Sequence, residues 1–162
     1  MCKIKLLILL LTSFFIFSCT NNQINHSTQK YSLAYIGGEY DGLMLKNYLT
    51  SRLKNLNIYD QNSKFEIQAD INHITDLYIT NIDNTSDRER INTQLSIKIL
   101  DKNSNCDVFN DKINISQFYI YTSSDKFLSN QTAAKKIKKD NTESAVRQFI
   151  NKLKKVDGKC HE

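Results

Sequence analysis

The sequence predicts an α+β fold of the two-layer sandwich type, in which a mainly antiparallel four-stranded sheet carries two helices on one face. Residues 65–72 and 91–99 alternate apolar and polar side chains, as strands with one dry and one wet face do. Residues 42–56 and 132–156 instead repeat apolar side chains at three- and four-residue steps, the spacing of amphipathic helices. With one more strand at each end of this series, the expected element order is β-α-β-β-β-α.

The folded body is expected to begin with a strand at residues 31–36, a β-favouring run that stops at two glycines. This strand is buried on both faces if Ala34 and Ile36 also pack. Asp41 is then expected to cap the helix at 42–56, whose apolar stripe indicates core packing. Because this helix joins the first two strands, those strands can be parallel neighbours or lie apart in the sheet.

A long antiparallel hairpin follows. The strand that begins at Phe65 is expected to continue to about residue 82, and the polar turn 81–87 leads into the strand at 91–99. A second turn leads into the fourth strand, at 108–121. Its alternation slips between Ile115 and Phe118, which predicts a bulge or bend there and an end that is apolar on both sides.

The last helix is predicted at 132–156, after a polar connector at 122–131. One side of this helix is apolar and the rest is rich in lysine and arginine. A solvated face, whose lysine stems cover apolar surface, is the favoured interpretation. The alternative is a basic face for an anionic partner. Gly158 is expected to end the helix and begin a short tail.

Charge and cysteine content set limits on function. The formal net charge of +5 falls to +3 if a signal peptide with Lys3 and Lys5 is removed, so nucleic acid is not an expected partner. Cys106 and Cys160 would then be the two cysteines left in the folded body. They are expected to be free thiols, with a disulfide between them as the alternative.

No catalytic or metal-binding motif is present. The sequence contains no glycine-rich phosphate loop, no GxSxG and no HExxH, and no Cys/His cluster has the spacing of metal ligands. His26, His73 and His161 lie far apart in the chain and are interpreted as surface or strand residues. We therefore expect no enzyme, no catalytic residue, no metal and no cofactor.

Arg88 and Arg90 are the candidate binding residues. Arginine is scarce in this lysine-rich chain, and two arginines two residues apart at the base of a strand point to the same face. Their planar guanidinium groups suit bidentate binding of phosphate or carboxylate. The alternative, which is favoured on the residues alone, is a surface pair balanced by Asp87 and Glu89.

The N-terminus has the pattern of a secretory signal, with lysines followed by the short apolar run 6–17. The stretch Ile16-Phe17-Ser18-Cys19-Thr20 resembles the lipobox of bacterial lipoproteins, although Phe17 departs from the usual residue type. The resemblance implies cleavage before Cys19 and covalent lipid on it, an N-acyl group and an S-diacylglycerol group. The alternatives are an uncleaved anchor and an ordinary cleaved signal.

These features together divide the chain into four parts. We expect a lipoprotein signal peptide at 1–18, a lipidated flexible tether at 19–30, a single α+β domain at 31–157 and a tail at 158–162. Residues 20–30 are polar and aperiodic, and a tether of this length spans at most about 35 Å when extended.

The lipobox, the domain size and the element order together resemble the LPS-assembly lipoprotein family, the LptE-like lipoproteins. The resemblance lies in architecture and spacing over nearly the whole mature chain, including the hairpin around Arg90–Leu95. It implies a lipid-anchored protein on the periplasmic face of the outer membrane that plugs a large LptD-like β-barrel and assists the insertion of lipopolysaccharide. In that family, basic residues near the hairpin turn contact lipopolysaccharide, and Arg88 and Arg90 lie in the corresponding region.

A second class of function is also compatible with these features. The chain could be an auxiliary periplasmic lipoprotein of an ABC-type lipid-transport system, or another lipid-binding module. Thr20 favours the outer membrane, because an Asp after the lipidated cysteine is the residue that favours inner-membrane retention.

Overall fold

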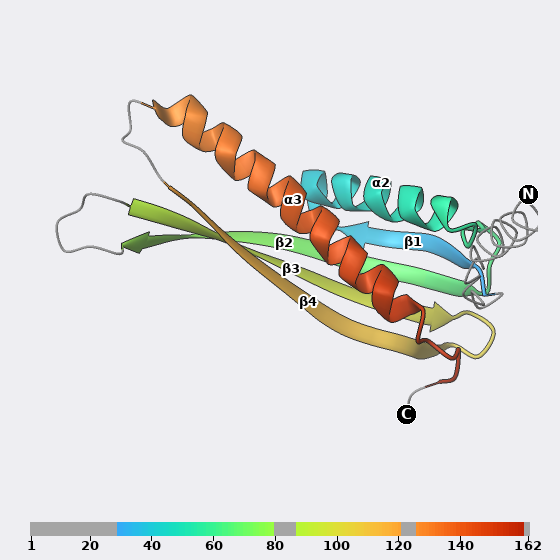
Figure 1. The fold of residues 1–162 in the computed structure, drawn as a ribbon. Coiled ribbons are helices and arrows are strands. Elements are labelled where there is room, and N and C mark those ends of the chain that lie inside the picture. Colours follow the sequence, from blue (N-terminus) through green and yellow to red (C-terminus); the bar gives the residue numbers. More distant parts are fainter. Residues whose placement is uncertain (1–28, 80–86, 121–125, 161–162) are drawn as a thin grey trace, which may run out of the picture.

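A computed structural model describes residues 29–79, 87–120 and 126–160. These residues form β1 (Tyr31–Gly37), α2 (Glu39–Asn55), β2 (Phe65–Ile79), β3 (Asp87–Asp101), β4 (Cys106–Ile120) and α3 (Phe127–Leu153). The strands make one sheet in the order β1-β2-β3-β4, and both helices lie on one face of it (Figure 1). The predicted fold class and element order are confirmed. The predicted signal peptide and most of the tether lie outside the described residues.

β1 and β2 are parallel neighbours, whereas β2–β3 and β3–β4 are antiparallel. Of the two arrangements left open for the first two strands, the adjacent one is therefore observed. β1 is not buried on both faces, because Ala34 and Tyr35 are exposed and Ile36 is half-buried. The reason is that no described element covers the second face of the sheet (Figure 1).

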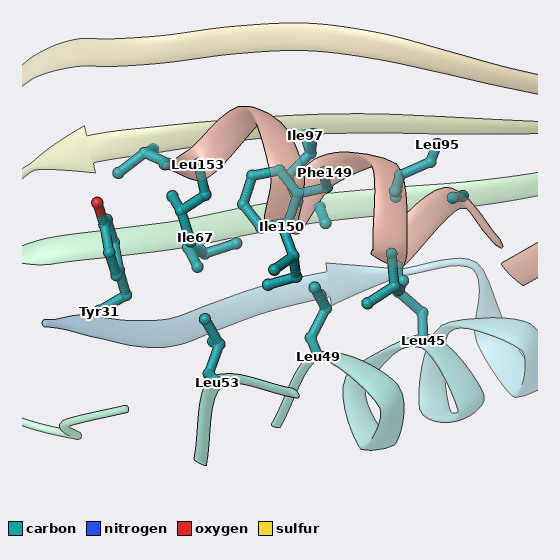
Figure 2. Packing of buried hydrophobic residues seen from close by; sticks show 14 of the residues in the cluster. Tyr31, Leu45, Leu49, Leu53, Ile67, Leu95, Ile97, Phe149, Ile150 and Leu153 are labelled. Carbon is teal, nitrogen blue, oxygen red and sulfur yellow. The ribbon is translucent and has the colours of Figure 1, made fainter. Parts of the chain in front are cut away.

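The core lies between the sheet and the two helices. Leu45, Leu49 and Leu53 of α2 meet apolar side chains of the sheet and of α3 (Figure 2). Apolar residues occupy every second position through much of β2 and β3, and these positions lie on the covered face, as predicted. The fully buried sheet and α3 residues in this core include Ile67, Leu95, Ile99, Val146 and Phe149.

The start of α2 differs from the prediction. The helix begins at Glu39 instead of residue 42, and Asp41 lies inside its first turn and does not cap it. Gly38 occupies the capping position with φ of 105°, a conformation that favours glycine. A Cβ at Gly38 would also lie 2.4 Å from the carbonyl oxygen of Ile71. The close approach of the chain to β2, and not a side-chain cap, therefore determines this turn.

The predicted bulge near the end of β4 is not observed, because Ile115 to Phe118 pair in continuous register with β3. The register instead shifts at the other end of the strand, between Ile99 and Leu100 of β3. The slip in alternation at Phe118 instead puts Phe118 and Ile120 on the uncovered face of the sheet, where they are 51% and 65% exposed.

α3 begins at Phe127, five residues before the predicted start, so part of the polar connector is helical. Its apolar side faces the sheet as expected, through Ala145, Phe149 and Leu153. Phe149 packs against Phe109 of β4, with ring centroids 5.8 Å apart.

The expectation of two free thiols is wrong, because Cys106 and Cys160 form a disulfide. The bond ties the C-terminal tail to the first residue of β4, and their Cα atoms lie 5.7 Å apart. The sequence pattern predicts that the fourth strand starts at residue 108, but β4 starts at Cys106. Because α3 returns along the sheet, its C-terminal end comes close to the start of β4, a proximity that residue spacing alone does not reveal (Figure 1).

The two ends of the molecule differ. We call the end that holds Tyr31, the disulfide and the end of α3 the proximal end, and the opposite end of the sheet the distal end (Figure 1). At the proximal end, the Tyr31 N–H donates to the carbonyl of Ile58 at 2.8 Å, and the Asp60 N–H donates to the carbonyl of Tyr31 at 2.9 Å. The described chain therefore enters and leaves at the same end of the sheet.

Candidate functional site

The two candidate arginines lie at the distal end of the sheet, on its open face. Arg90 is paired in register with Asp76 of β2 and Phe118 of β4, and Arg88 is paired with Ile120. Residues opposite each other in a sheet share a face, so both arginines share the open face with these neighbours. The expectation that Arg88 and Arg90 point the same way follows from this register.

The partners of the arginines differ from those expected. Arg90 donates from Nη2 to Oδ2 of Asp76 at 3.2 Å, and the Asn92 side chain donates to the same oxygen at 2.9 Å. Glu89 does not balance either arginine, because it faces the other side of the sheet and accepts a hydrogen bond from the hydroxyl of Tyr119. The sequence pattern missed Asp76 because the pairing joins residues 14 positions apart.

Arg88 has a different environment from Arg90. Its side chain is exposed, and no described carboxylate lies within ion-pair distance of it. The side chain of Asp87 lies outside the described residues. Arg90 is thus oriented by its ion pair, while Arg88 presents a cation to solvent. This arrangement can place one fixed and one adaptable guanidinium group beside an anionic ligand.

Apolar side chains surround the two arginines on the same face. Ile74, Phe118 and Ile120 are 50%, 51% and 65% exposed, and exposed apolar residues that gather on one face mark interaction or ligand sites. We call Ile74, Arg88, Arg90, Phe118 and Ile120 the distal patch. Sequence analysis singled out its arginines alone. The signal for the others was the polar-face position of Ile74 and the broken alternation at Phe118.

On the covered face, a polar network lies between the layers at the middle of the sheet. His73 was expected at the surface or in a strand, and it does lie in β2, but its side chain is only 1% exposed. Its Nδ1 lies 2.7 Å from the hydroxyl of Thr93, and its Nε2 lies 3.4 Å from the hydroxyl of Thr142. Asn141 of α3 donates to the same Thr93 hydroxyl at 2.9 Å.

Burial lowers the pKa of His73. Asp41 of α2, 3.9 Å from Nε2, acts in the opposite direction, and the positive charge of Lys138 on α3 lowers the pKa further. The neutral imidazole is therefore the favoured form, and it joins β2 to β3 and α3. This network is a structural connection between the layers, since both ring nitrogens already have partners.

Within residues 29–79, 87–120 and 126–160, no group of three or more Cys, His, Asp or Glu side chains could hold a metal ion. In the same part of the chain no helix is long and apolar enough to cross a membrane. The predicted lipidation residue, Cys19, lies outside the described residues.

Comparisons with known proteins place the fold. No protein-family model matches the chain, and no curated protein matches its sequence. A crystal structure of a lipoprotein from Caulobacter crescentus has 14% identity and a TM-score of 0.57, covering 80% of this chain and 92% of that one. The chain shares the fold of bacterial lipoproteins.

Two further structures with this lipoprotein fold are similar to the same extent. The minor lipoprotein from Acinetobacter baumannii has 10% identity and a TM-score of 0.58, covering 78% of this chain and 93% of that one. The rare lipoprotein B from Shewanella oneidensis has 11% identity and a TM-score of 0.54, and the match covers 76% of this chain and 96% of that one. The match extends over nearly the whole of these structures, so the described domain corresponds to their complete fold.

Proposed function

We propose that this chain is an outer-membrane lipoprotein, anchored through Cys19, that acts as a non-enzymatic plug and assembly subunit of the lipopolysaccharide translocon. The observation that carries the proposal is the distal patch, where two arginines stand beside exposed apolar side chains on an open sheet face. Lipopolysaccharide combines phosphate groups with acyl chains. Guanidinium groups bind phosphate, and apolar side chains bind acyl chains, so the patch matches both parts of the ligand.

The placement of the distal patch supports the same role. The lipid anchor precedes the chain that enters at the proximal end, while the patch lies at the distal end of 15-residue strands. At about 3.3 Å per residue, these strands hold the patch roughly 45 Å from the proximal end. The tether adds up to about 35 Å. A body of this shape reaches from a membrane surface into a barrel lumen while its patch faces away from the anchor.

The similarity in fold supports only the assignment to bacterial lipoproteins. The similar structures are bacterial lipoproteins, one of them a rare lipoprotein B, and the lipobox at Cys19 fits the same class. The partner in this proposal is a large LptD-like β-barrel of the outer membrane, and the ligand is lipopolysaccharide.

The experiment that tests the role is a pull-down of the full chain, lipidated at Cys19, from membranes in mild detergent. We expect recovery of a large outer-membrane barrel protein. A matched Cys19→Ala chain, which lacks the lipid, controls for anchoring. Recovery of inner-membrane lipid-transfer components without a barrel would contradict the proposal and favour the auxiliary role in an ABC-type lipid-transport system.

A further inference from the structure

β2 extends beyond the strand that covers its outer edge. β1 pairs with Phe65–Asp70 and ends at Gly37, where the chain turns into α2. β2 continues to Ile79, and no described residue pairs with its outer edge after Asp70. Alternate residues of a strand direct their backbone N–H and C=O groups to opposite edges. Among the described residues, those of 71–79 that face outward therefore have no strand partner and can pair with a further strand.

The side chains along this edge do not protect it. Ile74 on the open face is 50% exposed, and Leu77 on the helix side is 57% exposed. Proteins commonly block free edges with lysine or proline, but residues 71–79 contain neither. Their one charged residue, Asp76, is already paired with Arg90. The edge therefore has both the backbone groups and the apolar contacts that strand addition uses.

A basic cleft opens beside the start of this edge. It lies between the first turns of α2 and the first half of α3, has a volume of about 360 Å³, and includes Tyr40 and Asp41 in its lining. Asp41 also lies 3.9 Å from His73 of β2, so the cleft adjoins the sheet where the unpaired edge begins. Four lysines of α3 line it: Lys135, Lys136, Lys138 and Lys139. Four cations against one carboxylate give the cleft a positive charge that complements acidic side chains.

We propose that an extended, acidic segment of a partner protein binds as an additional strand beside residues 71–79 of β2, in line with β1. Its side chains alternate between the two faces of the sheet. Carboxylates on the helix side meet the lysines of α3, and apolar side chains on the open side pack against Ile74. This site is separate from the distal patch and does not depend on lipopolysaccharide binding.

The chain's own N-terminal segment is not the occupant. Residues 1–28 contain no Asp or Glu, so they cannot complement the four lysines. They also join the described chain beside Tyr31, at the proximal end, whereas the unpaired edge begins after Asp70 and runs toward the distal end.

The test uses a capped eight-residue peptide that alternates Glu and Val, with binding to the full chain followed by fluorescence anisotropy. We expect saturable binding that weakens with salt, and no binding of the corresponding Lys/Val peptide. Two further peptides carry backbone N-methyl groups on the Glu residues or on the Val residues. Because alternate residues direct their N–H groups to opposite edges, one methylated peptide should lose at least tenfold in affinity and the other should not.

The outcome of this comparison decides between strand addition and simple charge attraction. If both methylated peptides bind like the parent, or both lose binding equally, single-edge pairing is overturned. Hydrogen exchange provides a second measurement: the amides of residues 71–79 that face the outer edge should exchange more slowly with the parent peptide bound. Unchanged exchange there would also overturn the proposal.

Variants locate the acidic contacts. Lys135→Glu/Lys139→Glu should weaken peptide binding at least tenfold. Lys112→Glu, on the open face of the sheet in β4, should leave peptide binding unchanged. Both changes are at solvent-accessible lysines, so the melting temperature of each variant checks that it is folded. If phosphatidylglycerol vesicles bind with this lysine dependence while the peptide does not bind, the cleft is a site for anionic lipid and the proposal is overturned.

Discussion

At the scale of single residues, His73 holds the two layers together through its neutral form. Both ring nitrogens face hydroxyl groups, one on β3 and one on α3, and the ring is sealed from solvent. A proton on this ring would place a charge in a buried position beside the cation of Lys138 on α3; the carboxylate of Asp41 on α2 acts in the opposite direction. Protonation therefore opposes folding.

We predict that stability falls as the pH drops below about 6.5, the ordinary pKa of histidine. The pKa of His73 is lowered in the folded state, so in this range the unfolded chain binds the proton and the folded chain does not. The free energy of unfolding should then rise with pH up to about 6.5 and level off above it. Urea unfolding between pH 5 and 8 measures this slope.

A matched pair of variants isolates the contribution of His73. His73→Gln should flatten the slope, while His161→Gln, in the C-terminal tail, should keep it. An equal slope in His73→Gln and in the parent would show that other groups cause the pH dependence.

For the distal patch, we predict that Arg88→Ala/Arg90→Ala weakens lipopolysaccharide binding at least tenfold. Hydrogen bonds to charged groups contribute about 1.5–3 kcal/mol each, so losing two guanidinium groups has a large effect. Stability should change by less than about 1 kcal/mol, because the Arg90–Asp76 pair is partly exposed. Equilibrium binding and thermal unfolding measure the two quantities.

Lys98→Ala/Lys112→Ala provides the control for this prediction. These lysines lie on the same open face but away from the distal patch. A similar loss of binding in both double variants would indicate general charge attraction and would remove Arg88 and Arg90 from the proposed site.

The arginines could be found from the sequence because arginine is rare in this chain and their two-residue spacing fixes a common face. Ile74 and Phe118 leave a signal in the patterns of their own strands. Their position beside the arginines, like the pairing of Asp76 with Arg90, depends on the register between β2, β3 and β4. Periodicity reports which face a residue occupies within its strand. It does not report which residues of a neighbouring strand lie beside it.

At the scale of elements, the disulfide joins the end of the chain to the start of β4. Cys106 and Cys160 are 54 residues apart, so the bond closes a loop that contains β4 and α3. Closing a loop of this length restricts the unfolded chain. We predict that Cys106→Ser/Cys160→Ser lowers the free energy of unfolding by about 2–4 kcal/mol. Denaturant unfolding of the double variant and of the oxidised parent measures the difference.

Reduction of the parent protein provides an independent check. With the thiols reduced, the parent should unfold like the double variant. Equal stability of oxidised parent, reduced parent and double variant would show that the bond does not stabilise this fold.

Element types were predictable because β2, β3 and both helices carry strong periodic patterns. The residues at which these helices and strands begin and end were less predictable. The pattern assigned Asp41 to a cap, yet the approach of Gly38 to Ile71 determines where α2 starts. The disulfide was the alternative and not the favoured prediction for the same reason, because the position of α3 relative to β4 is a tertiary property.

At the scale of the whole molecule, the proposed anchor determines where the protein works. We predict that Cys19→Ala moves the protein from the membrane fraction to the soluble periplasmic fraction. The physical reason is the loss of lipid chains, which contribute about 0.8 kcal/mol per buried CH₂. Cell fractionation with immunoblotting measures the distribution.

Ser18→Ala provides the control, because it keeps a small residue before the cysteine, and this variant should remain in the membrane. A Cys19→Ala chain that also remained there would contradict the lipoprotein assignment.

The pairing of β1 with β2 also has a mechanical consequence. If the anchor holds the chain at Tyr31 while a partner holds the distal end, tension acts along the strand axis. In this parallel pair the hydrogen bonds run across the direction of pull, so β1 would have to slide past β2 and break several bonds together. The backbone hydrogen bonds that join Tyr31 to Ile58 and Asp60 would resist the same force at the start of β1. This strand pairing would therefore resist a force that pulls on the domain at the end where the proposed tether joins it.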